Sequence, residues 1–350
     1  MTSLPNGRHG NRFRRVQGNE ASGRPQPVPR ITVVMPAYNR ADLIGASIES
    51  ALAQTFRDFE LIVVDDGSTD ATREAVQRVH DPRLTLLPLP HRGMSAAMNA
   101  GVRAARGDYF ARLDSDDLWH PEFLETTLAA MERPPRVGVV YTRARTFADD
   151  PTLLEADRGL PLTFSGKPFE SMLVRDHASA AALVRVECHR RVGGFDEALP
   201  WWEDWDFWLR VSRHYAFRFV DRTLVRLRIH GANASRAGGG AAWATRIHVL
   251  DKAFAALPSL DADLERIRAL AYRNAHFDAG LHLWRCKSPK AAAREFSRGL
   301  RASGNPARAG GRLLYLLLLH HLGRVPLVRE AHRTLSRARQ RWRHGTATTD

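Results

Sequence analysis

The chain has 350 residues, a formal net charge of +14 and a hydrophobic content of 44%, which allows two domains or one large domain with an appendage. A positive surplus of this size suits negatively charged partners, such as nucleic acid, anionic lipid or a polyanionic substrate. The two cysteines, Cys188 and Cys286, lie far apart in the sequence, which excludes a disulfide framework and a cysteine-based metal site.

The first 29 residues differ in composition from the rest of the chain. They are rich in glycine, proline, arginine and asparagine, and they are predicted to be a disordered basic arm because they cannot bury apolar surface. They also lack the apolar stretch of a secretory signal. The longest apolar run, 313–319, is far shorter than the roughly 20 residues that cross a bilayer. We therefore expect a cytoplasmic protein, with a peripheral position at the inner face of the membrane as the alternative.

Strand-like and helix-like patterns alternate from residue 30 onward. Apolar runs of strand type occur at 31–36, 60–64, 84–87 and 109–113. Helical spacing of apolar residues lies between them, and the helix at 95–105 is rich in small residues, so it should pack closely. This alternation predicts an α/β fold of Rossmann-like type, with a mostly parallel sheet flanked by helices.

Polar clusters follow three of these strands. They are Tyr38-Asn39, Asp65-Asp66 and the acidic segment Asp114-Ser115-Asp116-Asp117. The carboxyl ends of parallel strands meet at one edge of a sheet, where open α/β sheets place their ligands. Neighbouring carboxylates repel one another, and a divalent cation shared with substrate phosphates would neutralise them. The alternative for the acidic segment is a solvated turn that caps the next helix, but the convergence of three clusters favours the metal.

Two other α/β enzyme classes are excluded by the turn after the first strand. A dinucleotide-binding domain needs G-x-G-x-x-G there, and residues 35–40 read MPAYNR, without a glycine. A haloacid-dehalogenase-type phosphatase needs a nucleophilic aspartate after the first strand, and none is present.

Six motifs in this order resemble family 2 glycosyltransferases with the GT-A fold. They are 33–39 (VVMPAYN), 63–70 (VVDDGSTD), 113–117 (LDSDD), 193–197 (GGFDE), 202–210 (WEDWDFWLR) and 228–235 (RIHGANAS). The resemblance covers about residues 30–235, which we take as the glycosyltransferase domain. It implies transfer of a sugar from a nucleotide-sugar donor, with inversion at the anomeric carbon.

The resemblance also implies which residues bind the nucleoside part of the donor. Pro36, Ala37 and Tyr38 would form part of the base pocket, with the ring of Tyr38 near the nucleobase. Asp65 would accept a hydrogen bond from the base. Asp66 would be structural or lie near the ribose. The alternative for Tyr38 is ordinary packing.

The acidic segment would hold the ribose and the diphosphate with its metal, Mn²⁺ or Mg²⁺. By position in the motif, Asp114 would face the ribose, Ser115 would lie beside the donor, and Asp116 would bind the metal. Asp117 is a candidate second carboxylate. His230 follows a strand-like run at 223–229 and would contact the metal or the diphosphate, although a lone histidine is more often structural.

Inversion in a single displacement needs a base for the acceptor hydroxyl. The resemblance implies that Asp204 is this base and that Glu203 contacts the acceptor or orients the loop. Apolar neighbours raise the pKa of a carboxylate towards working pH, and three tryptophans flank the pair: Trp201, Trp202 and Trp205. The alternatives are that Glu203-Asp204 caps the helix at 205–214 and that the tryptophans belong to the core.

One motif departs from the family pattern. Many relatives carry Ala-Arg-Asn-x-Gly in the third helix, and this chain has Met98 in place of the arginine. Loss of that charge affects the expected donor more than the reaction class, and Arg92 is a candidate to compensate. The Gln-x-x-Arg-Trp motif of processive synthases is absent, so we expect the transfer of a single sugar.

The basic region 236–350 is predicted to be α-helical, with helices at about 242–256, 260–282, 288–302, 310–322 and 326–340. The spacing of Gly280, Ala292 and Phe296 matches one tetratricopeptide-like hairpin, with a generic helical bundle as the alternative. The run 313–319, next to many arginines, would lie either on an anionic membrane surface or inside the bundle.

The sequence therefore predicts an inverting, metal-dependent transfer of one sugar, with a UDP-sugar as the expected donor. The acceptor would be a glycan or a lipid-linked molecule of cell-envelope or exopolysaccharide assembly. The alternative is a catalytically inactive scaffold of the same fold that binds partners through its basic tail. No module of interleaved aromatic and basic residues indicates nucleic acid as a partner.

Overall fold

The computed structural model describes residues 28–148, 157–159, 161–164, 166–175, 182–230, 239–305, 307, 309–311 and 314. The predicted basic arm, apart from its last two residues, lies outside the described residues. So does the predicted helix at 326–340, together with most of the one at 310–322.

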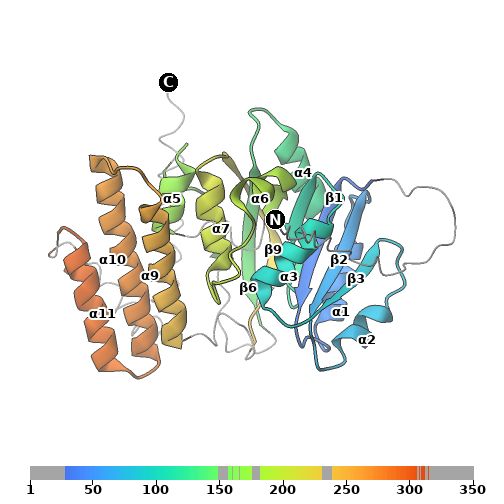
Figure 1. Cartoon of the computed structure of the whole chain (residues 1–350), viewed down its shortest axis with the longest axis horizontal. Helices are drawn as coiled ribbons and strands as arrows, with labels where there is room; N and C mark the ends of the chain where they lie inside the picture. The colour runs from blue at the N-terminus through green and yellow to red at the C-terminus, as the bar shows by residue number, and fades with distance from the viewer. Residues whose placement is uncertain are drawn as a thin grey trace, which may run out of the picture.

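The first half of the domain consists of four strands joined by helices, as the alternation predicted (Figure 1). The elements are β1 (Ile31–Ala37), α1 (Ile44–Leu52), β2 (Phe59–Asp66), α2 (Thr72–Gln77), β3 (Leu84–Leu89), α3 (Met94–Ala104) and β4 (Tyr109–Arg112). These strands lie in the order β3-β2-β1-β4, and each neighbouring pair is parallel.

The second half adds strands of both directions. Its elements are β5 (Leu118–Trp119), α4 (Phe123–Glu132), β6 (Val139–Phe147), β7 (Asp157–Arg158), α5 (Pro168–Val174), β8 (Ala182–Arg185), α6 (Val186–Val192), α7 (Glu203–Ser212) and β9 (Phe217–Arg228). β8 pairs antiparallel with both β4 and β6, and β9 runs parallel to β6. The sheet thus continues from β4 through β8, β6 and β9 to β5, and the predicted α/β class is confirmed.

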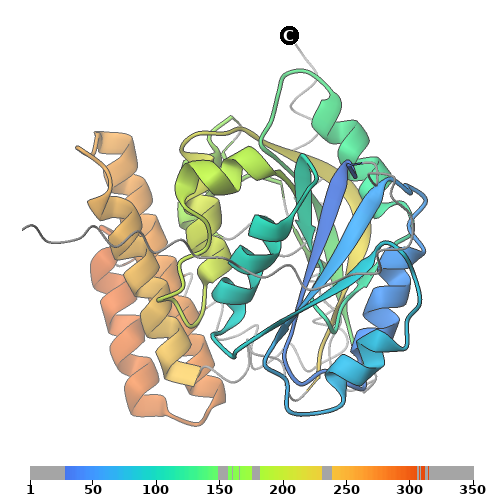
Figure 2. The ribbon, with the colours of Figure 1, turned by 45° about the vertical axis from the view of Figure 1, so that its right-hand side comes forward.

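Apolar cores lie on both faces of the sheet, because side chains alternate along each strand. Val33 belongs to the core under α1 and α4, whereas its neighbour Val34 belongs to the core under α3 and α7 (Figure 2). A Cβ at Gly101 in α3 would lie 2.3 Å from Val34 Cγ1, so only glycine allows this approach. The close packing predicted for this helix is therefore confirmed.

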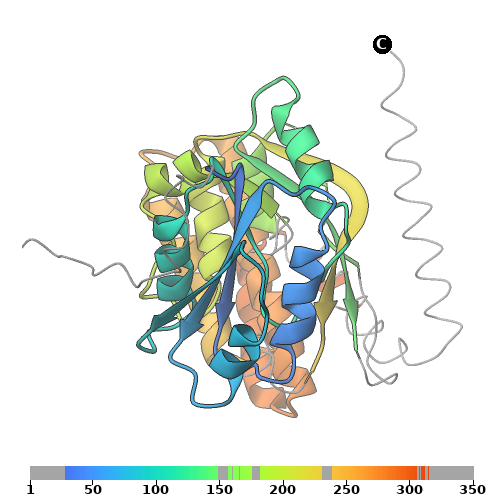
Figure 3. The ribbon, with the colours of Figure 1, turned by 90° about the vertical axis from the view of Figure 1, so that its right-hand side faces the viewer.

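Three helices follow the sheet: α9 (Gly239–Ala255), α10 (Ala262–Arg285) and α11 (Pro289–Ala302). They stand side by side next to α7 (Figure 1) and lie behind the sheet in the view of Figure 3. Val249, Leu250 and Ala271 join the same apolar core as Val34, so the helices are packed onto the sheet domain. None of the helices in the described residues is both long enough and apolar enough to cross a membrane.

The predicted contact between α10 and α11 is present. A Cβ at Gly280 would lie 2.3 Å from the Phe296 ring, and Ala292 is fully buried in the small core of this hairpin. The three residues singled out by their spacing therefore form one contact surface.

Candidate active site

The nucleoside side of the site lies where β1 and β2 end. Pro36 and Ala37 are buried at the end of β1, and the next residue, Tyr38, is 40% exposed. The Tyr38 ring stacks on the His91 imidazole, with 4.1 Å between ring centroids and 21° between planes. The two rings form an exposed platform at the sheet edge that offers a π-face to a nucleobase.

The two aspartates after β2 have different partners. Asp65 is fully buried, pairs with the Arg73 guanidinium and accepts a hydrogen bond from the Ser68 amide at 3.1 Å. Asp66 accepts hydrogen bonds from the amides of Arg92 and Gly93, both at 2.8 Å, and its Oδ2 lies 2.8 Å from His91 Nδ1. Asp66 therefore fixes the turn that carries the His91 ring, which favours the structural alternative for this residue.

Asp114 lies next to an arginine to which the sequence analysis gave no role. Arg112 Nε is 2.6 Å from Asp114 Oδ1, and Arg112 Nη2 is 3.1 Å from Asp114 Oδ2, a bidentate pair. The third nitrogen, Nη1, lies 3.2 Å from Glu203 Oε1. Burial opposes the charge of this guanidinium, but the carboxylates of Asp114 and Glu203 raise its pKa above the ordinary value. Arg112 thus connects the acidic segment to the start of α7.

The remaining acidic residues contact the end of β9. His230 Nε2 lies 2.9 Å from Asp116 Oδ2, and Arg40 Nε lies 3.6 Å from the same oxygen. Asp117 is buried and accepts a hydrogen bond from the Arg228 amide at 2.8 Å. Burial raises the pKa of Asp117 well above its ordinary value, and the negative charges of Asp114 and Asp116 raise it further. Asp117 is therefore placed to anchor the loop that presents His230.

Asp116 and His230 supply two ligand atoms suited to a divalent ion. A carboxylate oxygen and an imidazole nitrogen fit Mn²⁺, and Mg²⁺ is commonly bound by one or two carboxylates together with substrate phosphates. Among the residues that the structure describes, no group of three or more His, Cys, Asp or Glu side chains is arranged to hold an ion. Two protein atoms would leave most of the coordination shell of such an ion to other ligands.

Glu203 and Asp204 are the first two residues of α7. Asp204 Oδ1 accepts a hydrogen bond from the Trp205 amide at 2.7 Å, so this carboxylate also stabilises the first turn of the helix. Burial raises the pKa of Asp204, and Arg112 opposes this shift. Burial and the charge of Asp204 raise the pKa of Glu203 to about 7. Both carboxyl groups are stronger bases than free ones.

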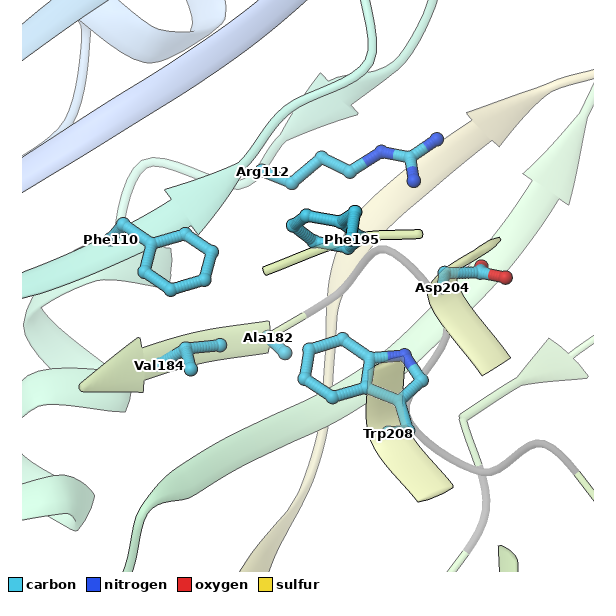
Figure 4. A pocket seen from close by; sticks show the side chains of 7 residues that line it. All are labelled: Phe110, Arg112, Ala182, Val184, Phe195, Asp204 and Trp208. Atoms are coloured by element: carbon cyan, nitrogen blue, oxygen red, sulfur yellow. The ribbon is translucent and has the colours of Figure 1, made fainter. Parts of the chain in front are cut away.

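A small cavity of about 10 Å³ lies beside Asp204. Figure 4 shows the Arg112 and Asp204 side chains at this cavity together with three aromatic rings. The lining residues are Phe110, Arg112, Ala182, Val184, Phe195, Asp204 and Trp208. A cavity of this size is about large enough for one water molecule. Its apolar walls explain why Asp204 is poorly solvated.

Two of the tryptophans near Asp204 make structural contacts. Trp205 is fully buried and donates its indole N–H to the Met172 carbonyl at 2.7 Å. Trp202 is half-buried and donates its indole N–H to the Ala242 carbonyl of α9, also at 2.7 Å. Their contacts support the alternative that these two tryptophans belong to the core.

In the third helix, α3, Met98 takes the place of the arginine of the family pattern. Its side chain is fully buried in the apolar core, so it does not face the proposed donor site. Arg92, the candidate to compensate, pairs with Glu197 at 2.9 Å. Asn99 accepts a hydrogen bond from the Phe195 amide at 2.8 Å and donates one to the Phe195 carbonyl at 2.9 Å. Arg92 and Asn99 therefore hold the 193–197 loop.

Comparison with known proteins supports the resemblance to family 2. The family model described as Glycosyl transferase family 2 matches residues 32–193. This segment is therefore similar to family 2 glycosyltransferases. A hyaluronan synthase from Pasteurella multocida is 30% identical over 210 residues, which cover 59% of this chain and 21% of that protein. The chain therefore spans about a fifth of the length of that relative.

Solved structures show the same fold at low sequence identity. S. aureus TarS 1–349 in complex with UDP-GlcNAc has a TM-score of 0.61 and 18% identity, and the match covers 87% of this chain and 92% of the other. The mannosyltransferase PcManGT from Pyrobaculum calidifontis, in complex with GDP-Man and Mn²⁺, has a TM-score of 0.52 and 23% identity, with coverage of 86% and 83%. The predicted GT-A-like fold is confirmed.

Three residues that contact the site were not predicted from the sequence: Arg112, His91 and Arg40. A signal for Arg112 was available, because residues two apart on a strand share a face and Arg112 ends β4 two positions before Asp114. No local pattern places His91 against Tyr38, because that contact depends on how two turns meet across the sheet edge.

Proposed function

We propose that the chain transfers one sugar from a nucleotide-sugar donor to a hydroxyl group of a glycan or lipid-linked acceptor, with inversion and with a divalent metal. The observation that carries the proposal is the Arg112 bridge, which brings the donor-side carboxylate Asp114 and the Glu203-Asp204 pair into one cluster. An enzyme that displaces a nucleotide from a sugar needs both sets of groups within reach of one sugar ring.

The donor would bind along the sheet edge. The Tyr38–His91 platform would face the base, Asp65 would accept a hydrogen bond from it in exchange for one of its present partners, and Asp114 and Ser115 would lie towards the ribose. Asp116 and His230, with Asp117 behind them, would hold the metal, which when bound neutralises charge on the departing diphosphate. A UDP-sugar is the proposed donor. The GT-A-like fold accommodates UDP-GlcNAc in TarS and GDP-Man with Mn²⁺ in PcManGT, which supports a nucleotide sugar in general.

Asp204 would remove the proton from the acceptor hydroxyl as that oxygen attacks the anomeric carbon. Its raised pKa strengthens it as a base, and the Arg112 charge opposes that rise. Glu203, held by Arg112, would orient the loop and contact the acceptor.

The basic helices suit an anionic surface near the acceptor. Arg294, Arg298 and Arg301 line a shallow hollow on α11 together with Ser297. We place this face of the protein against anionic headgroups at the membrane that carries a lipid-linked acceptor. Sedimentation with phosphatidylglycerol vesicles, compared with phosphatidylcholine vesicles, tests this part separately.

Thermal shift measurements with UDP-, GDP- and dTDP-sugars, each with and without Mn²⁺, test the enzyme proposal. We expect stabilisation that depends on both a UDP-sugar and the metal, followed by release of UDP when an acceptor is added. If none of the donors stabilises the protein in a metal-dependent way, the inactive-scaffold alternative is favoured.

A further inference from the structure

The residue before the catalytic pair has an unusual backbone conformation. Trp202 precedes Glu203 at the start of α7, and its φ of 63° and ψ of 22° lie in the left-handed region. This region is unfavourable for a bulky side chain, so contacts elsewhere must hold the residue there. Because Trp202 sets the direction in which α7 begins, its conformation decides where the Glu203 and Asp204 side chains point.

The contacts that hold Trp202 come from the C-terminal helices. Its indole N–H donates to the Ala242 carbonyl at 2.7 Å, and its ring lies 5.7 Å from the Trp243 ring, both in α9. The Arg246 guanidinium, one turn further along α9, lies 5.1 Å from the ring centroid of Trp202. It lies 5.3 Å from that of Trp205 and 5.5 Å from that of Trp243. We call these three rings around Arg246 the arginine cage.

The cage is buried and balanced in charge. Arg246 is 7% exposed, and its Nη1 lies 2.7 Å from Asp278 Oδ2 in α10. A planar guanidinium stacks on aromatic faces in a way that an ammonium group cannot, and cation–π contacts are strongest when they are desolvated. The cage therefore joins α7, α9 and α10 at the residue next to the catalytic pair.

We propose that Arg246 is a positioning residue for the transfer reaction. Through the cage it keeps Trp202 in the left-handed conformation that directs Asp204 towards the acceptor and Glu203 towards Arg112. The C-terminal helices thus complete the active site through their packing against Trp202. This inference rests on the proposed function, because it concerns the group proposed as the base.

The experiment compares arginine-to-methionine substitutions at the two ends of the same helix contact, in the full chain. Arg246→Met removes the centre of the cage. Arg213→Met is the matched control, because Arg213 donates to the Ala256 carbonyl at 3.1 Å and so joins the far end of α7 to the end of α9. For each variant, kcat and KM for transfer, the donor dissociation constant with Mn²⁺ and the Tm are measured.

Arg246→Met is expected to lower kcat by about 100-fold, since small displacements of a catalytic group cost about that much. Donor affinity should stay within about twofold of that of the parent, because the residues proposed to bind the donor are separated from Glu203 and Asp204 by Arg112. Arg246→Lys keeps the charge opposite Asp278 but loses the stacking, so its kcat should fall between those of the parent and Arg246→Met. Arg213→Met should keep the kcat of the parent within about twofold.

Three results would overturn the inference: a folded Arg246→Met with parental kcat, an equal loss of kcat in Arg213→Met, or a loss of donor affinity as large as the loss of kcat. If Arg246→Met does not fold, Trp202→Phe decides, because it keeps an aromatic ring in the cage but loses the indole N–H that donates to Ala242 and part of the ring contact. Its kcat should fall at least about threefold, and full activity would contradict the proposal. A parent chain inactive with every donor would instead overturn the proposed function, and this inference with it.

Discussion

The two sides of the site are held in different ways. On the donor side, the carboxylates of Asp65 and Asp66 are held mainly by backbone amides of the turns that follow β2 and β3. On the transfer side, Glu203 is held by Arg112 from a strand 91 residues earlier, and Trp202 is held by a helix 40 residues later. The nucleoside part of the donor side is thus built into the βα units, whereas the transfer side, like the Asp116–His230 pair, depends on how distant elements assemble. Changes to the second should affect turnover while leaving nucleotide binding intact.

The largest effect expected from breaking this separation is that of Asp204→Asn. General bases contribute about 10²–10⁴-fold to rate, so transfer should fall by about 1,000-fold. Donor binding with Mn²⁺ should remain close to that of the parent, because Asp204 lies on the transfer side. Rates of UDP release and thermal shifts with donor measure the two quantities. Asp157→Asn, which removes a carboxylate from the exposed pair with Arg145, is the control and should be silent. Normal turnover of Asp204→Asn would remove the base assignment.

Asp116→Asn should produce the opposite pattern, with a loss on the donor side. Donor affinity in Mn²⁺ should fall by about tenfold or more, equivalent to about 1.4 kcal/mol, because one of two protein ligands for the metal is weakened. Affinity without metal should change little. Titration of the donor with and without Mn²⁺ gives both values. An equal loss in both titrations would place Asp116 outside the metal site.

The sequence predicted the donor side better than the transfer side for a physical reason. Three of the four strands of the first half are largely apolar runs that a polar cluster follows, so this pattern located Asp65, Asp66 and the acidic segment at one edge. The resemblance then pointed to His230, which the structure brings to Asp116 from 114 residues away. Periodicity alone gives no such long-range pairing.

Apart from His91 and Arg40 on the donor side, the missed features belong to the side that assembles from distant parts. β6 and β8 were not predicted, and they extend the sheet in mixed directions. The Arg112 bridge and the arginine cage were also missed, because each joins residues from three separate elements. A pattern confined to one element carries no information about which other element packs against it.

Glu203→Gln sharpens the comparison through the pH dependence of stability. The pKa of Glu203 is raised to about 7 in the folded chain, so the folded state binds a proton more tightly than the unfolded state. Its contribution to stability is fully present below its ordinary pKa and is lost as pH rises through about 7. Glutamine cannot ionise, so the free energy of unfolding of the variant should rise by up to about 3 kcal/mol relative to that of the parent as the pH goes from 5 to 8. Melting curves of both proteins at the two pH values measure this. The same pH dependence in both proteins would contradict the raised pKa of Glu203.

The smallest effects on transfer should come from two glycine-to-alanine changes that strain the packing on opposite sides of the molecule. A Cβ at Gly101 would press against Val34 under the donor edge, and a Cβ at Gly280 would press against Phe296 in the helical hairpin, each at 2.3 Å. Overpacking of this kind costs about 1–3 kcal/mol, so both variants should melt at lower temperature. Gly101→Ala should also weaken donor binding, because α3 would shift against β1. Gly280→Ala should leave both donor binding and kcat unchanged, because α11 lies on the far side of α10 from the arginine cage. A kcat loss in Gly280→Ala would show that the transfer side depends on the whole helical region, beyond the α9 and α10 contacts that form the cage.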